Sequence, residues 1–230
     1  MTTLGELTAA IAHEINQPLS AVVTRGRACL NWLNREPPDL EKVRSSVAAI
    51  IDSGKRAGEV INRLRAMMTK SPTHRDLLNI NDAILAVIPL VSAEAQRNRV
   101  LLRTELSNDL PLVLGDRIQL QQVILNLIMN AIEAMRGIDE TQRNVLVVSR
   151  MDGSESALVE VRDSGAGLKE LALDQLFDPF YTTKPDGMGI GLAVSRTIIE
   201  SHDGQLRALP NVPNGAVFQF RLPTNDKVIE

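Results

Sequence analysis

The sequence predicts an α+β protein in which a hairpin of two long helices precedes an α/β sandwich. Apolar residues recur at three- and four-residue steps through the first ~70 residues, which is the period of an amphipathic helix. A polar, proline-bearing break follows at 70–74, and after it short alternating segments are interspersed with helical ones. Such an order is satisfied by helices layered on one mixed sheet. We therefore expect two domains, residues 1–72 and 73–230.

The hairpin is predicted from one apolar stripe on each helix. The first stripe comprises Leu4, Leu7, Ile11, Ile15, Leu19, Val22, Leu30 and Leu33. The second comprises Leu40, Val43, Val47, Ile50, Ala57, Ile61, Leu64 and Met68. Pro37 and Pro38 lie between them, where proline ends one helix and can open the next. Because two helices alone leave this seam wet, we expect a homodimer with a four-helix bundle. The alternative is that the helices pack on the rest of their own chain.

The second domain is predicted from alternating strand and helix patterns. The strands are expected near 77–80, 100–106, 145–150, 157–162, 205–209 and 216–222. The helices are expected at 81–98, 116–135 and 189–202, with Asn81-Asp82 and Asp116 as N-caps. We expect all the strands to form one mixed sheet.

Composition narrows the possible functions. Hydrophobic residues make up 44% and charged residues 23% of the chain, as in soluble globular proteins. A net charge of −3 without a basic stripe gives no basis for a nucleic-acid partner. No apolar run approaches the ~18 residues of a membrane span. The single Cys29 cannot form an internal disulfide, so we expect a reducing, cytoplasmic location.

His13 is the first candidate for chemistry. It lies two positions from both Ile11 and Ile15, so it faces away from the helical seam. Glu14 can hold one ring nitrogen and leave the other basic, which makes His13 a plausible nucleophile. Taken alone, an ordinary surface histidine explains the residue better.

Asn126, Asn130 and Glu133 form the second candidate set. Their four- and three-residue spacing places them on one helical face. Amide and carboxylate oxygens are hard ligands that suit Mg²⁺. The polar outer face of an amphipathic helix is an equally good explanation.

Glycine-rich segments form the third and fourth sets. Asp163 follows a strand and precedes Gly165 and Gly167, so its carboxylate could accept a hydrogen bond from the adenine amine. An ordinary turn would look the same. Gly187, Gly189 and Gly191 precede a helix, whose N-terminus can bind phosphates. A dinucleotide-binding fold would need a strand before such a motif, and here a loop precedes it.

The ordered set resembles the sensor histidine kinases of two-component signalling over nearly the whole chain. The H-box corresponds to His13–Leu19, the N-box to Asn126–Glu133 and the G1 box to Asp163–Gly167. The F-box corresponds to Phe177–Phe180 and the G2 box to Gly187–Gly191. The last third resembles the cytoplasmic, PAS-linked branch of this family.

The resemblance implies a dimerisation and histidine-phosphotransfer hairpin followed by a Bergerat-type ATP-binding domain. It implies ATP and Mg²⁺ as cofactors, autophosphorylation of His13 with Glu14 as base or orienting group, and transfer to an aspartate of a response regulator. Its ATP and Mg²⁺ residues would be Asn126, Asn130 (the metal ligand), Glu133, Asp163, Gly165, Gly167, Phe180, Thr183, Lys184, Gly187, Gly189, Gly191 and Leu192. An upstream sensor domain is expected outside this chain.

Two residues refine these expectations. Related ATPases of this fold have a glutamate where this chain has Asn126, and an amide cannot activate water as a base. Many relatives have Thr or Asn four residues after the phosphorylated histidine, whereas this chain has Gln17, so we expect weak phosphatase activity. Two rival functions remain at this point: a catalytically inactive docking module, and an ATPase or serine/threonine kinase of the same fold.

Overall fold

The structure, a computed structural model, describes residues 4–68, 75–139, 142–168, 175–182 and 189–225. In the first two helices it describes side chains only for residues 17–54 and for 57 and 58. The chain divides into two compact units, Met1–Thr69 and Lys70–Glu230, and each is described by itself.

The first unit is a helical hairpin made of α1 (Leu4–Leu33) and α2 (Leu40–Met68), which confirms the two predicted helices. Asp39 precedes α2 and caps its N-terminus, because its Oδ1 accepts a hydrogen bond from the Lys42 backbone N–H at 3.1 Å. That backbone hydrogen bond is the main cause of the lowered pKa of the Asp39 carboxyl. Trp32 lies beneath the Arg35 guanidinium and the Lys42 ammonium, 3.9 and 4.3 Å from its ring centroid. The turn is therefore fixed by capping and by cation–π contacts.

Several of the described residues of the two apolar stripes are exposed in a single copy of the chain. Leu30 is 60% exposed, Leu40 63% and Val47 42%. Among the described side chains of the hairpin, only Ser46 and Ala57 are buried. Within the described part of the chain, no helix is long and apolar enough to cross a bilayer.

The second unit is an α/β sandwich. Its helices are α3 (Ile80–Arg97), α4 (Arg117–Ala134) and α5 (Gly191–Ser201). Its strands are β1 (Asp76–Leu78), β2 (Leu101–Leu106), β3 (Val113–Gly115), β4 (Asn144–Asp152), β5 (Ser156–Asp163), β6 (Gln205–Pro210) and β7 (Ala216–Pro223).

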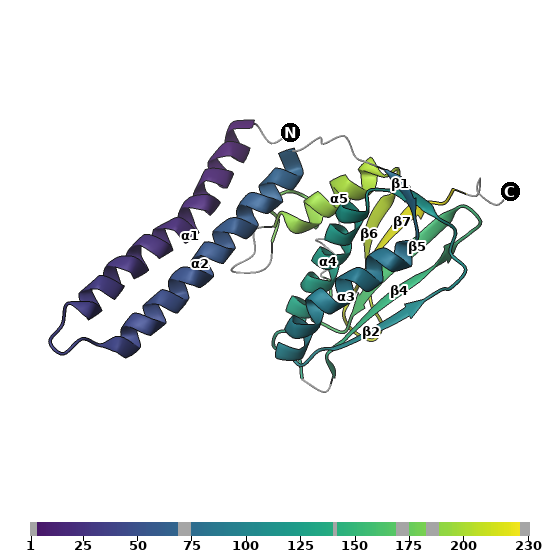
Figure 1. Cartoon of the computed structure of the whole chain (residues 1–230). Helices are drawn as coiled ribbons and strands as arrows, with labels where there is room; N and C mark the ends of the chain where they lie inside the picture. The colour runs from purple at the N-terminus through teal and green to yellow at the C-terminus, as the bar shows by residue number, and fades with distance from the viewer. Residues whose placement is uncertain (1–3, 69–74, 140–141, 169–174, 183–188, 226–230) are drawn as a thin grey trace. The chain divides into compact units, whose positions relative to one another are not determined.

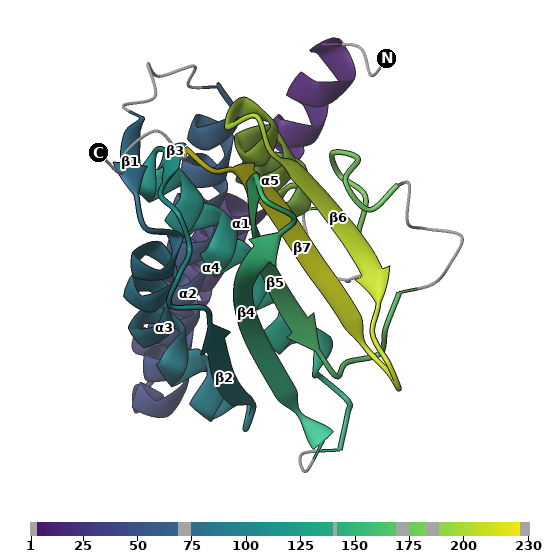
Figure 2. The same cartoon turned by 90° about the vertical axis from the view of Figure 1, so that its right-hand side faces the viewer.

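The main sheet has the strand order β2-β4-β5-β7-β6, and Figure 2 shows these strands side by side. Strands β2 and β4 are parallel, and the other neighbouring pairs are antiparallel. Helices α3, α4 and α5 all lie on one side of this sheet (Figure 1). The core between the two layers is closed by fully buried side chains, including Ile84, Ile124 and Phe220.

Two local expectations were wrong. Strand β1 does not join the main sheet but pairs with the short strand β3 in a separate two-stranded sheet. Helix α3 begins earlier than predicted, because Asn79 is its N-cap and accepts a hydrogen bond from the Asn81 N–H at 2.9 Å. The reason is packing: Ile80 is fully buried and serves as the first core residue of the helix rather than the last residue of a strand. Asp116 caps α4 as predicted.

Candidate functional site

Three elements of the second unit converge on one region: α4, the loop that follows β5, and the start of α5. Helix α4 packs against both β5 and α5. The G1 loop lies against the end of α4, since a Cβ added at Gly165 would come within 2.7 Å of the Ala134 carbonyl oxygen. The predicted N, G1 and G2 sets are therefore brought together by packing, although up to 65 residues separate Asn126 from Gly191.

Asp163 is the last residue of β5 and is only 2% exposed. Its Oδ1 accepts hydrogen bonds from the backbone N–H groups of Gly165, at 2.8 Å, and Ala216, at 3.1 Å. Its main-chain oxygen accepts a third from the Asn211 side-chain amide, at 2.8 Å. A carboxylate in such surroundings has a fixed orientation, which suits the recognition of a flat donor such as an adenine amine.

Glycines allow this close approach of main chains. Gly215 has φ +105°, and an added Cβ would lie 1.9 Å from the carbonyl oxygen of Asp163. Gly167 has φ +77° and lies against Gly215. A Cβ added at Gly167 would lie 3.3 Å from the carbonyl oxygen of Gly215. The G1 loop and the β6–β7 turn are thus packed directly on each other.

Asn126 connects the N-box helix to the G2 helix. Its Nδ2 donates a hydrogen bond to the Ser195 hydroxyl of α5 at 3.0 Å, and Ser195 is 2% exposed. A Cβ added at Gly191 would lie 2.5 Å from Asn126 Oδ1, so only glycine fits there without displacing the amide. Asn130 and Glu133 lie one and two turns further along α4 on the same face, and both are half-buried.

The F-box segment is fastened to the start of α5. The Phe180 N–H donates to the Gly189 carbonyl oxygen at 3.1 Å, and Phe180 has φ +70°. Gly189 has φ +64°, and a Cβ there would lie 2.4 Å from the Phe180 carbonyl carbon. The Arg196 guanidinium lies 5.7 Å from the Phe177 ring centroid. Leu192 is half-buried in the first turn of α5.

Several predicted residues fall outside the description. The backbone of His13 and Glu14 is helical within α1, but their side chains lie outside the described part. Thr183, Lys184 and Gly187 lie outside it entirely. Gln17 is described as an exposed residue of α1.

His202 is the only histidine whose side chain the described residues include, and its surroundings are structural. It is 2% exposed, its Nε2 accepts from the Asp116 N–H at 2.9 Å, and its Nδ1 lies 2.7 Å from the Ile198 carbonyl oxygen. The Nδ1–H tautomer satisfies both contacts. It therefore joins the end of α5 to the N-cap of α4, which argues against a role as phosphoryl acceptor.

The sequence did not point to three residues of this region: Ser195, Asn211 and Gly215. Ser195 lies one helical turn after Gly191, and Asn211 and Gly215 are turn residues between two strands. A serine one turn into a helix and an asparagine or glycine in a hairpin turn are detectable in the sequence, but each is common in ordinary helices and hairpins.

Comparisons with known proteins match both units. Residues 3–71 match the His Kinase A (phospho-acceptor) domain family. Residues 115–226 match the family of histidine kinase-, DNA gyrase B- and HSP90-like ATPases. The chain is 37% identical over 229 residues to sensor protein FixL of Bradyrhizobium diazoefficiens, covering 99% of this chain and 45% of that protein. It is 36% identical over 224 residues to sensor histidine kinase TmoS of Ectopseudomonas mendocina, covering 97% and 23% respectively.

Solved structures give the same result. The catalytic domain of histidine kinase ThkA superposes with a TM-score of 0.59 at 33% identity, covering 66% of this chain and 96% of that one. ThkA in complex with response regulator protein TrrA superposes with a TM-score of 0.72 at 27% identity, covering 98% of this chain and 63% of that one. The chain spans less than half the length of FixL and TmoS. With both units matched in this order, the chain belongs to the sensor histidine kinases.

Proposed function

We propose that this chain is an ATP-dependent protein histidine kinase that phosphorylates its own His13 and transfers the phosphoryl group to an aspartate of a response regulator. Residues 1–72 would form the dimerisation and phosphotransfer domain, and residues 73–230 the catalytic domain. The observation that carries the proposal is that α4 contacts both other motifs: Asn126 touches the G2 residue Gly191, and Ala134 at the end of the helix touches Gly165, two residues after the buried Asp163. Such a convergence is what a nucleotide site needs and what an inactive docking module would not need to keep.

ATP and Mg²⁺ fit the chemistry of these residues. Asp163 offers an oriented carboxylate to the adenine amine. Asn130 would ligate Mg²⁺ through its amide oxygen, and Glu133 lies on the same helical face to support it. The N-terminal end of α5 at Gly191 offers backbone N–H groups to phosphates. When bound, Mg²⁺ would neutralise phosphate charge, and the protein's own task would be to align the groups.

Partners follow from the same proposal. The solved complex of ThkA with TrrA supports a response regulator as the acceptor of the phosphoryl group. The exposed stripe of the hairpin supports a homodimer. The lengths of FixL and TmoS support a sensor domain elsewhere in the full protein. The compartment that we propose is the cytoplasm, where ATP is available.

The test is to incubate the purified chain with γ-labelled ATP and Mg²⁺. We expect an acid-labile, alkali-stable label that is absent in His13→Gln and retained in the control His74→Gln. Nucleotide affinity of His13→Gln should stay within about twofold, because the two tasks belong to different domains. A label on His13→Gln would show that another residue is the acceptor.

Nucleotide recognition needs its own measurement. Asp163→Asn should weaken ATP binding about ten- to a hundredfold, since it removes one partner of a buried charged hydrogen bond. GTP binding should change much less, because guanine presents an oxygen at the corresponding position. If calorimetry showed an unchanged ATP affinity, the adenine site would have to lie elsewhere on the chain.

Gln17 bears on the reverse reaction. Its amide sits on a stem one methylene longer than that of asparagine, and misplacing a catalytic water by about 1 Å can cost a hundredfold in rate. We propose weak phosphatase activity that Gln17→Asn raises. Rapid decay of phosphorylated partner with the unmodified chain, lost in Gln17→Ala, would contradict this.

A further inference from the structure

The sheet face opposite the helices, which we call the outer face, carries one arginine on every strand. The strand registers place these residues on it: Arg103 of β2, Arg150 of β4, Arg162 of β5, Arg221 of β7 and Arg207 of β6. In the described part of this unit, all three helices lie on the other side of the sheet (Figure 1). No described helix of this unit therefore covers the arginine-bearing outer face, on a chain whose net charge is −3.

Apolar side chains lie between these arginines. Reading the registers across the sheet from β2 to β6, one row consists of Arg103, Leu146, Arg162, Val217 and Leu209. Leu209 is 42% exposed. In protein–protein contact surfaces arginine is enriched and lysine is depleted.

Carboxylates form ion pairs with the arginines in the middle of the outer face but not with those at its edges. Glu160 accepts hydrogen bonds from Arg150 Nη2 and Arg162 Nε, both at 3.1 Å, and Asp152 Oδ2 lies 2.7 Å from Arg221 Nε. Glu160 is 4% exposed.

At the two edges the charges differ from those in the middle. Arg103 and Arg207 are exposed, and neither forms an ion pair with a described residue. Glu105 lies two residues from Arg103 and likewise has no ion pair among them. Strands β2 and β6 are four strand spacings apart, and Arg207 lies two residues from Leu209, the residue in the row of Arg103. The two edge arginines are therefore separated by about 20 Å.

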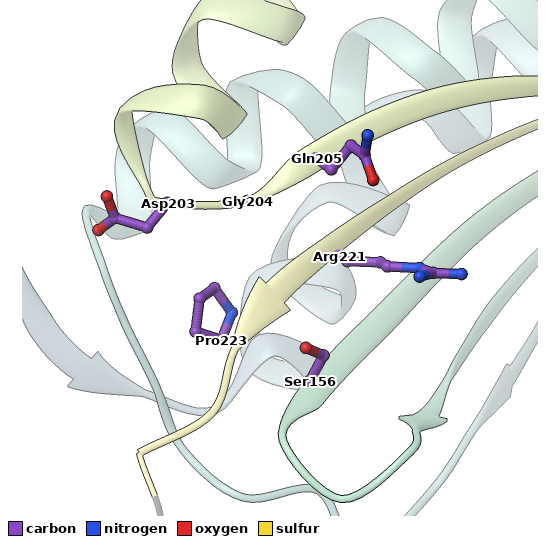
Figure 3. Close-up of a pocket in the computed structure, with 6 residues that line it drawn as sticks. All are labelled: Ser156, Asp203, Gly204, Gln205, Arg221 and Pro223. Carbon is purple, nitrogen blue, oxygen red and sulfur yellow. The ribbon is translucent and has the colours of Figure 1, made fainter.

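A shallow pocket of about 200 Å³ marks one corner of the outer face. Figure 3 shows its lining, which includes Ser156 of β5, Gln205 of β6 and Arg221 of β7. Asp203 lies at its rim. Because Arg221 is already paired with Asp152 and Asp203 lines the same pocket, this corner is not a point at which we place a partner's carboxylate.

The size of the outer face indicates the kind of complex. Its central strands are eight or nine residues long, so with a width of about 19 Å the face covers about 500 Å². That is below the ~800 Å² per partner of stable complexes and fits a transient signalling contact.

We propose that the outer face docks a protein domain whose contact surface carries carboxylates at two points about 20 Å apart, with apolar side chains between them. The partner's carboxylates would pair with the edge cations Arg103 and Arg207, and its apolar side chains would pack on the aliphatic residues of the row. A nucleic acid or an anionic membrane fits less well, since Glu105, Asp152 and Glu160 share the face and would repel a continuous array of phosphates.

The experiment begins with a photo-crosslinking residue at position 209 of the full-length protein in its host cells. The control carries it at position 118 on α4, because Ile118 is also apolar and is 76% exposed. A protein crosslinked from position 209 is then purified, and its Kd for the chain is measured by calorimetry. We expect a micromolar Kd for the unmodified chain. The Kd should rise about tenfold or more in the double variant Arg103→Glu with Arg207→Glu. Replacing the partner's contacting carboxylates with lysines should restore the binding of this double variant.

Matched control variants separate a specific effect of the edge arginines from a general effect of charge or folding. Arg117→Glu changes an exposed arginine on α4 and should leave the Kd unchanged. Autophosphorylation should be the same in all these variants, which also shows that they fold. The proposal is overturned if position 209 gives no more adduct than position 118, or if the adduct is a second copy of this chain. It is also overturned if charge reversal on the partner restores nothing, or if duplex DNA or phosphatidylserine vesicles bind through these arginines.

Discussion

At the residue scale, Glu160 shows how a charge is kept on an almost buried position. Burial by itself raises the pKa of this carboxyl, but hydrogen bonds from Arg162 and Arg150 outweigh it, and the pKa lies below its ordinary value of 4.5. The two arginines remain 39% and 51% exposed, so water shares their solvation. The cluster therefore contributes less than a fully buried ion pair and more than a surface one.

This arrangement predicts a pH dependence of stability. A carboxyl whose pKa is depressed on folding stabilises the protein above its unfolded-state pKa, and the contribution is lost as the pH falls through the lower folded-state pKa. We expect Glu160→Gln to reduce the free energy of unfolding at neutral pH by about 2 kcal/mol. At a pH below the lowered folded-state pKa of Glu160, the variant and the unmodified chain should converge.

Urea denaturation at several pH values checks this prediction. Glu105→Gln is the control, because Glu105 is exposed and lies on the same face. Its effect should be small at every pH. An equal loss in Glu160→Gln at neutral and at acidic pH would contradict an electrostatic origin.

Ser195 allows a second prediction at this scale. Ser195→Ala removes the acceptor of the Asn126 amide and leaves a half-buried Nδ2 without that partner. We expect a stability loss of about 1–3 kcal/mol and a raised KM for ATP, since the amide can then turn toward Gly191. Thr197→Ala is the matched control on α5, because its hydroxyl bonds only to the Ala193 carbonyl of its own helix. If autophosphorylation kinetics gave Ser195→Ala an unaltered KM for ATP, Ser195 would have no role in the nucleotide site.

At the element scale, the turn of the β6–β7 hairpin packs directly against the G1 loop. Gly215→Ala would bring a Cβ within 1.9 Å of the Asp163 carbonyl oxygen, in addition to its unfavourable φ of +105°. The strain of positive φ alone costs about 1–3 kcal/mol. We therefore expect a larger loss of stability in this variant, together with a clear loss of ATP affinity.

Gly153→Ala separates the two causes. Gly153 also has a positive φ, +70°, but an added Cβ there would meet nothing within 4 Å. It should cost only the backbone strain and leave ATP binding intact. If the two variants behaved alike in calorimetry and thermal unfolding, contact between the hairpin and the G1 loop would not matter for binding.

At the scale of the whole molecule, the hairpin cannot bury its own stripe. Leu30 and Val47 remain 60% and 42% exposed in a single copy. We expect a homodimer in solution that Leu30→Asp with Val47→Asp converts to monomers, because charges in the buried seam would be unpaired. Arg27→Asp with Arg44→Asp, which changes exposed polar positions of the same helices, should stay dimeric. Light scattering at micromolar concentration measures both, and a monomeric unmodified chain would contradict the four-helix bundle.

Local patterns explain why much of the fold was predictable from the sequence. The helix periods of α1 and α2, the cap at Asp116 and the strand alternation of β4 and β5 are properties of consecutive residues, and all were confirmed. The set of nucleotide-site motifs could also be read from the chain, because glycine and asparagine spacings are local. Strand β3 is three residues long and gave no detectable pattern.

Only the tertiary structure decided which of these elements meet. Sequence spacing does not state strand order, so the separation of β1 and β3 from the main sheet and the alignment of five arginine-bearing strands came from the fold. The contacts of Asn126 with Ser195 and of Asp163 with Ala216 likewise join residues that lie 69 and 53 positions apart. Such contacts arise because α4, α5 and the sheet bury their apolar faces against one another, and that packing sets which polar groups are brought within hydrogen-bonding distance.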